Sequence, residues 1–85
     1  SPYPTAWCIF KEANQEWNVK IHEAQFELEE HSESVGKIIS AKKELKIAVL
    51  GGFIHIMSLQ FPGKKKMTIQ ELLNGMTFSE NTNVC

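Results

Sequence analysis

Residues 45–61 read LKIAVLGGFIHIMSLQF and decide the fold, because two β-rich runs flank a pair of glycines. Apolar residues alternate with other residues in both runs, which is the pattern of half-buried strands: Leu45, Ile47 and Val49 in the first run, Ile54 and Ile56 in the second. Gly51-Gly52 is a strong hairpin signal, since glycine adopts a positive φ without steric cost. The stretch therefore predicts two antiparallel strands, residues 45–50 and 53–61, the second ended by Pro62-Gly63.

The period of two continues upstream of this hairpin. It predicts a short strand over residues 7–10, a polar connection at 13–15, a long strand beginning near Trp17, and a third strand over 35–40. In the long strand the apolar positions change parity, from Trp17, Val19 and Ile21 to Ala24, Phe26 and Leu28. Because a slip of one residue turns every later side chain to the other face, we expect a bulge near His22–Glu23. Residues 29–34 are polar and are expected to form a loop, and residues 41–44 a turn.

Only the last segment has a helical pattern. Thr68 and Glu71 have the spacing of a capping box, Ile69, Leu72 and Leu73 share one helix face, and Gly75 is expected as the C′ stop. Five short strands in so small a chain would expose long edges unless they curl up, so the sequence predicts a five-stranded barrel with one short C-terminal helix. An open sheet with the helix packed across it is the alternative.

The size and composition limit the chain to one globular domain over residues 1–85. It is 42% hydrophobic and 22% charged, which is typical of a folded domain and excludes a disordered tail. No apolar run approaches the roughly 20 residues that a membrane helix needs, and the opening residues have no signal-peptide pattern. We therefore expect a cytoplasmic protein without a membrane partner, in which Cys8 and Cys85 are free thiols.

The charged residues are unevenly distributed along the chain. The formal net charge is −1, which argues against generic electrostatic binding to nucleic acid. However, one stretch (residues 23–33) holds five glutamates and no lysine, and most lysines come later. Every basic residue is lysine, so no planar guanidinium is available for bidentate reading of bases, and any nucleic-acid contact is expected at phosphates.

Lys64, Lys65 and Lys66 are the candidate binding residues. They lie between the end of a predicted strand and the start of the predicted helix, whose N-terminus adds positive potential. Lys42 and Lys43, in the turn before residue 45, are expected to join them on one side of the barrel. The plainer interpretation is that such a lysine run is only a solvated loop.

Metal binding and catalysis find no support in the residues. His22, His31 and His55 lack any metal-ligand spacing, and we expect a solvated acidic face with incidental histidines and no metal. No nucleophile motif and no glycine-rich phosphate loop occurs, so we expect no catalytic residue within this chain.

Three motifs together resemble the C-terminal domain of methionyl-tRNA formyltransferases, most closely those of the Bacteroides group. They are Ser1-Pro2-Tyr3-Pro4-Thr5-Ala6-Trp7, Leu59-Gln60-Phe61-Pro62-Gly63-Lys64-Lys65-Lys66-Met67, and Glu71-Leu72-Leu73-Asn74-Gly75. The resemblance implies an all-β, five-stranded, OB-like Greek-key barrel with one short C-terminal helix, preceded by an interdomain linker that ends at residues 1–5. It also implies that Lys64 and Lys65 match a Gly-Lys-Lys motif that contacts tRNA, with Lys66 extending it.

The same resemblance implies the rest of the enzyme. An N-terminal formyltransferase domain would bind 10-formyltetrahydrofolate and carry the catalytic residues, so this chain itself would hold no cofactor. The parent enzyme would formylate initiator methionyl-tRNA, and the partners of this chain would be that tRNA and the N-terminal domain.

Two alternatives remain open at this point. The chain resembles, less specifically, the accessory C-terminal barrel of nucleotide-sugar N-formyltransferases. A free-standing OB-type nucleic-acid-binding module is the other possibility; it needs exposed aromatic residues, whereas Trp7, Trp17, Phe26 and Phe61 are expected on core faces.

Overall fold

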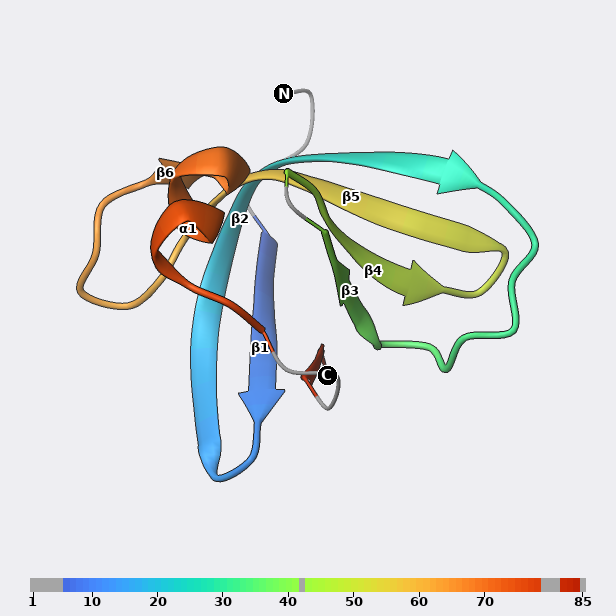
Figure 1. Ribbon diagram of the computed structural model, residues 1–85, viewed down its shortest axis with the longest axis horizontal. Helices are drawn as coiled ribbons and strands as arrows, with labels where there is room; N and C mark the ends of the chain where they lie inside the picture. The colour runs from blue at the N-terminus through green and yellow to red at the C-terminus, as the bar shows by residue number, and fades with distance from the viewer. Residues whose placement is uncertain (1–5, 42, 79–81, 85) are drawn as a thin grey trace.

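The computed structural model describes residues 6–41, 43–78 and 82–84 and has a single twisted sheet that curls into a nearly closed barrel (Figure 1). Its elements in chain order are β1 (Ala6–Glu12), β2 (Gln15–Leu28), β3 (Ile38–Ser40), β4 (Leu45–Val49), β5 (Gly52–Gln60), β6 (Met67–Thr68), α1 (Ile69–Gly75) and β7 (Asn83–Val84). No helix in the described part of the chain is long and apolar enough to cross a membrane. The proposed linker at residues 1–5 lies outside the described residues.

The strand order is β3-β4-β5-β2-β1-β7, with β6 paired to β5. The hairpin-connected strands β3, β4 and β5 lie side by side, and β2, which reaches β3 through a long connection, lies beside β5. This arrangement is a Greek key. The all-β barrel with one short helix is therefore confirmed, and β1 to β5 are the five expected strands, although β3 begins at Ile38 rather than at residue 35.

The strand that closes the barrel was not predicted. β7 pairs with β1 and also approaches the start of β3, where the Val84 amide donates to the Gly36 carbonyl at 2.6 Å and the Ile38 amide donates to the Thr82 carbonyl at 3.2 Å. Through these backbone bonds the C-terminal segment joins the two outer strands of the sheet. It thereby satisfies edge groups that would otherwise be free to pair with another chain.

A bulge in β2 divides the sheet into two parts. The pairing with β5 shifts register between Ile21 and Glu23 and again between Glu23 and Ala24, at the place where the parity change predicted it. Before the bulge Ile21 faces inward opposite Leu59, and after it Ala24 faces inward opposite Ile56. The single long strand can therefore keep apolar residues on the concave side while it bends.

The hairpin between β4 and β5 is confirmed, but its turn lies one residue earlier than the glycine pair suggests. Val49 pairs with Gly52, so Leu50 and Gly51 are the two turn residues, and Gly51 has φ +84°. Gly52 serves a different purpose, because a Cβ there would lie 2.0 Å from the backbone oxygen of Glu27 on the neighbouring strand. One glycine supplies the turn and the other allows the close approach of β2 and β5.

The barrel encloses one apolar core, and α1 packs against one end of it. Ile69 and Leu72 of the helix are buried, and burial of such side chains stabilises the fold by about 1.5–3 kcal/mol each. The capping box of Thr68 and Glu71 is present as expected. The prediction that Gly75 ends the helix as a C′ glycine is wrong. Gly75 is the last helical residue and does not have a positive φ, and Met76 follows it in an extended conformation.

Two of the four expected core aromatics face solvent instead. Phe61 is buried and Trp17 packs against the core edge-on to it, with ring centroids 5.8 Å apart. Trp7 is 65% exposed and Phe26 is 59% exposed. The β1–β2 register pairs Phe10 with Trp17, which places Phe10 in the core and turns Trp7 outward. Phe26 lies on the concave face, in the half of β2 that nothing in the described chain covers.

Cys8 is a free thiol that lies half-buried at the edge of the core. Burial raises the pKa of this thiol, which keeps it in its less reactive protonated form. Cys85 lies outside the described residues.

Candidate nucleic-acid interface

The three successive lysines lie on the connection between β5 and β6, which we call the basic loop (residues 61–66). Phe61, the first residue of the loop, is buried and anchors it to the core. The Lys64 amide donates to the Phe61 carbonyl at 3.1 Å. The side-chain amide of Gln60 donates to the Lys64 carbonyl at 2.9 Å. Lys64, Lys65 and Lys66 are all exposed, so the loop is anchored through its backbone while its ammonium groups face solvent.

The ammonium groups of the basic loop have no carboxylate within ion-pair distance among the described residues, unlike those of Lys11 and Lys37. Lys11 and Lys37 pair with Glu16 and Glu33 at 3.7 and 3.2 Å. Lys46 lies over the ring of Phe53, 4.1 Å from its centroid. Exposed lysines without partners are those that an incoming phosphate can neutralise without first breaking an ion pair.

The later part of the acidic stretch, residues 29–33, lies far from the basic loop, whereas Glu23 lies at the bulge opposite Ser58. In Figure 1 the connection from β2 to β3, which carries Glu29, Glu30 and Glu33, is at one end of the long axis, and the basic loop is at the other. The molecule therefore has a charge asymmetry despite its formal net charge of −1.

A row of side chains on the outer face of the sheet runs up to the basic loop. Trp7 pairs with Lys20 across β1 and β2, and Lys20 pairs with Gln60 across β2 and β5, so the three side chains point to the same side. The Lys20 ammonium lies 5.8 Å from the centroid of the Trp7 ring. His22 donates from Nε2 to the Gln60 Oε1 at 3.0 Å. We call Trp7, Lys20 and Gln60 the outer row; it adds a cation and an exposed aromatic ring beside the basic loop.

Sequence reasoning missed the outer row, although a signal was present. Alternation alone leaves open which parity of residues 7–10 faces the core. The two-residue turn at Ala13-Asn14 fixes this, because it pairs Glu12 with Gln15 and thereby sets Trp7 opposite a lysine.

The start of α1 does not supply the positive potential expected there. Thr68 Oγ1 accepts from the Glu71 amide at 3.2 Å, and Glu71 Oε1 accepts from the Thr68 amide at 3.0 Å. Hydrogen bonds from Thr68 hold the pKa of the Glu71 carboxyl below its ordinary value, and the charge of Lys65 lowers it further. The helix end is thus occupied by a carboxylate of its own chain, and the lysines must act alone.

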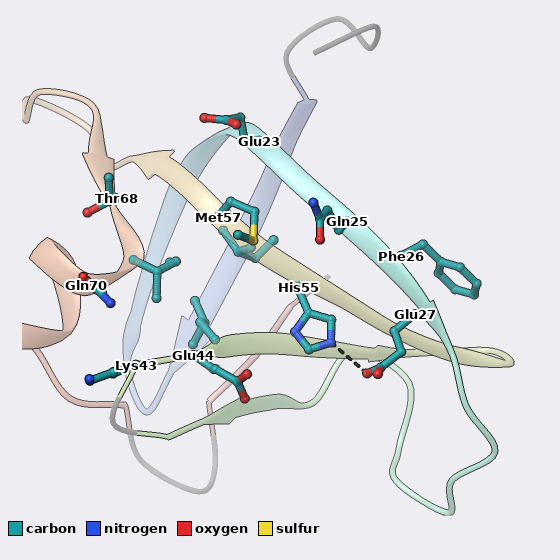
Figure 2. Close-up of a pocket in the computed structure, with 13 residues that line it drawn as sticks. Glu23, Gln25, Phe26, Glu27, Lys43, Glu44, His55, Met57, Thr68 and Gln70 are labelled. Carbon is teal, nitrogen blue, oxygen red and sulfur yellow. Dashed lines mark hydrogen bonds and ion pairs between the residues drawn. The ribbon is translucent and has the colours of Figure 1, made fainter.

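Lys43 lies in a different setting from the basic loop. It lines a groove together with Thr68, Gln70 and three glutamates, Glu23, Glu27 and Glu44 (Figure 2). His55 donates from Nε2 to Glu27 at 2.8 Å, and this bond is the main reason that the pKa of Glu27 is lowered. The groove is mainly acidic, which disfavours a phosphate. Lys42 lies outside the described residues.

Comparison with known proteins identifies the class of domain. A family model described as "Formyl transferase, C-terminal domain" matches residues 1–77, so this chain belongs to that family. The resemblance inferred from the three motifs is therefore confirmed.

Similar proteins are named methionyl-tRNA formyltransferase. One from Flavobacterium psychrophilum is 60% identical over 80 residues, which are 94% of this chain and 25% of that protein. One from Flavobacterium johnsoniae is 56% identical and aligns with 99% of this chain and 27% of its own length. One from Bacteroides thetaiotaomicron is 42% identical, with 94% of this chain and 26% of that protein aligned. The chain thus spans about a quarter of the length of these relatives.

Proposed function

We propose that this chain is the tRNA-docking domain of a methionyl-tRNA formyltransferase that acts in the cytoplasm. The observation that carries the proposal is the basic loop, in which Lys64, Lys65 and Lys66 are exposed, have no carboxylate of the described residues within ion-pair distance, and lie at the end of the molecule opposite the β2–β3 connection. The family and the names of its relatives support the choice of substrate class.

The parent enzyme transfers a formyl group from 10-formyltetrahydrofolate to the amino group of methionine on initiator tRNA. We assign the donor and the catalytic residues to a domain that precedes this chain. The groove lined by Ile47, Ile54 and Ile56 does not suit a folate, because besides the Cys8 thiol it offers only His22 and Gln25 as polar side chains, whereas a pterin ring needs several fixed donors and acceptors. The role of this domain is to add affinity and to orient the tRNA.

Phosphates are the groups that the basic loop binds. An ammonium group is a point charge that attracts the backbone without distinguishing bases, and the chain has no arginine to do so. The outer row extends the same surface, since Lys20 supplies a further cation and Trp7 a flat ring on which a base or ribose can lie. Lys43 and Lys42 contribute less, because the glutamates beside Lys43 oppose an anion.

The test is a salt titration of initiator tRNA binding to the full-length protein. Each phosphate contact on a duplex lowers the slope of log affinity against log salt by about 0.9, so three to five lysines give a slope near −3 to −4.5. A slope near zero at detectable affinity contradicts the proposal. The proposal is also contradicted if the full-length protein formylates a nucleotide-linked amino sugar and leaves charged initiator tRNA unmodified.

The exposure of Trp7 favours a second candidate, a surface for single-stranded nucleic acid of the OB type. That function predicts quenching of Trp7 fluorescence by an unstructured oligonucleotide at the same concentrations as by tRNA. The proposed tRNA function predicts quenching by tRNA at much lower concentrations. A Trp7→Leu variant identifies the signal, because Trp17 is the only other tryptophan.

A further inference from the structure

The second half of β2 presents apolar side chains that the described chain does not cover. After the bulge, Ala24, Phe26 and Leu28 lie on the concave face, and Phe26 and Leu28 are 59% and 82% exposed. Ala24 and Phe26 line a groove together with Ile47, Ile54 and Ile56, so the surface is continuous with the core. We call Ala24, Phe26, Leu28 and Ile54 the apolar shelf.

The strand edge beside the shelf is also open. β1 begins at Ala6, which pairs with Ile21, so β2 has no described neighbour on that side beyond the bulge. Its other side is fully paired with β5 as far as Leu28. An apolar face next to an unpaired edge is a surface that isolated domains normally avoid, because it invites association.

The opposite face of β2 is polar in this half of the strand. Glu23, Gln25 and Glu27 alternate with the shelf residues, and Glu27 is bonded to His55 on β5. On β2 beyond the bulge the exposed apolar side chains therefore all lie on one face; on the other face of the sheet Phe53 is buried against His31, and Met57 is exposed.

We propose that the N-terminal domain of the full-length protein packs on the apolar shelf. The relatives are about four times as long as this chain, and the matched region is their C-terminal domain, so most of their length precedes it. Ala6, near the N-terminal end of the chain, lines the groove, so a domain that precedes the chain is tethered beside the shelf. Apolar surface held at such short range favours an intramolecular partner over a second copy.

This docking leaves the basic loop free. In Figure 1 the shelf half of β2 and the basic loop are at opposite ends of the molecule. The inference rests on the part of the proposed function that places a catalytic domain before this chain, and it does not depend on tRNA binding.

The test is thiol labelling of the full-length protein without tRNA, read peptide by peptide by mass spectrometry. Phe26→Cys lies on the shelf, and Met57→Cys on the opposite face is the matched control. In this chain alone Phe26 is the more exposed of the two, 59% against 45%, so an uncovered shelf makes Phe26→Cys react as fast as the control or faster. A covered shelf reverses this order, and we expect Phe26→Cys to react at least about tenfold more slowly.

Equal or faster labelling of Phe26→Cys overturns the inference. Protection that disappears on dilution, together with a dimer in sedimentation, also overturns it, because a second copy then covers the shelf. Hydrogen exchange of the unmodified full-length protein gives a second measurement if the substitution disturbs folding: slow exchange of the amides on the open edge of residues 23–28 supports docking, and fast exchange contradicts it. Salt-dependent tRNA affinity, measured separately, shows whether the proposed function fails on its own.

Discussion

The side-chain amide of Gln60 at the end of β5 donates a 2.9 Å hydrogen bond to the backbone carbonyl of Lys64. The same amide group accepts from His22 through its oxygen, so Gln60 links the bulged region of β2 to the basic loop. The sheet thereby restricts the backbone from which the three lysines project. A restricted loop loses less conformational entropy when it binds an anion than a free one does.

Replacing Gln60 with leucine should weaken tRNA binding without removing a charge. A net hydrogen bond contributes about 0.5–1.5 kcal/mol, so loss of this anchor predicts an affinity about two- to tenfold lower. The salt slope should stay the same, since the number of lysines is unchanged. Filter binding at several salt concentrations measures both quantities, and a shallower slope in Gln60→Leu contradicts the anchoring role.

Removing lysines from the basic loop should change the slope itself. For Lys64→Ala/Lys65→Ala we expect the salt slope to become shallower by ~1.8, with a similar loss of affinity for any tRNA, because the contacts are to phosphates. Lys37→Ala/Lys46→Ala is the matched control, with the same change in net charge at lysines that have partners in this chain. Equal slopes for the two double variants count against the basic loop as the docking site.

The two glycines of the β4–β5 hairpin should differ in their tolerance of alanine. At Gly51 a Cβ meets open space and only the positive φ is unfavourable, so Gly51→Ala should lower the free energy of unfolding by about 1–2 kcal/mol. At Gly52 the Cβ would collide with the Glu27 carbonyl and push β2 from β5, so Gly52→Ala should lower it by about 2–4 kcal/mol. Urea denaturation compares them; an equal or larger loss for Gly51→Ala contradicts the structure of this turn.

The strands that alternation marks were predictable, and the closure of the barrel was not. Apolar alternation and the glycine pair located β1 to β5, and the parity change located the bulge, because each signal is local. β7 is two residues long and joins the sheet through backbone bonds to Phe10 and Gly36, which no side-chain pattern encodes. The sequence predicts a barrel because open strand edges are unfavourable, but it does not predict β7, the strand that covers those edges.

In the candidate site, too, the sequence identified the charged residues but not the neighbours that the fold brings to them. Lys64 to Lys66 are recognisable in the sequence as a charged run, whereas their lack of an ion pair among the described residues depends on where the glutamates of the β2–β3 connection lie in the fold. Lys20 and Trp7 lie 13 residues apart in the sequence and meet only because the register of β1 and β2 aligns them. Lys43 lies far from Lys64 in the sequence and does not share a groove with it. The groove that Lys43 lines is formed instead by the start of α1 and three glutamates.

Acid should weaken the start of α1. The pKa of Glu71 is held below its ordinary value of 4.5 by hydrogen bonds from Thr68, so the stabilisation is present above that value and is lost as the pH falls through the lower, folded-state pKa. Thr68→Ala, which removes the cap, should lower the free energy of unfolding by about 1 kcal/mol at pH 7. In thermal melts, the difference in melting temperature between Glu71→Ala and the unmodified chain should become smaller from pH 6 to pH 3. If this difference in melting temperature does not depend on pH, Glu71 stabilises the helix through packing rather than through its charge.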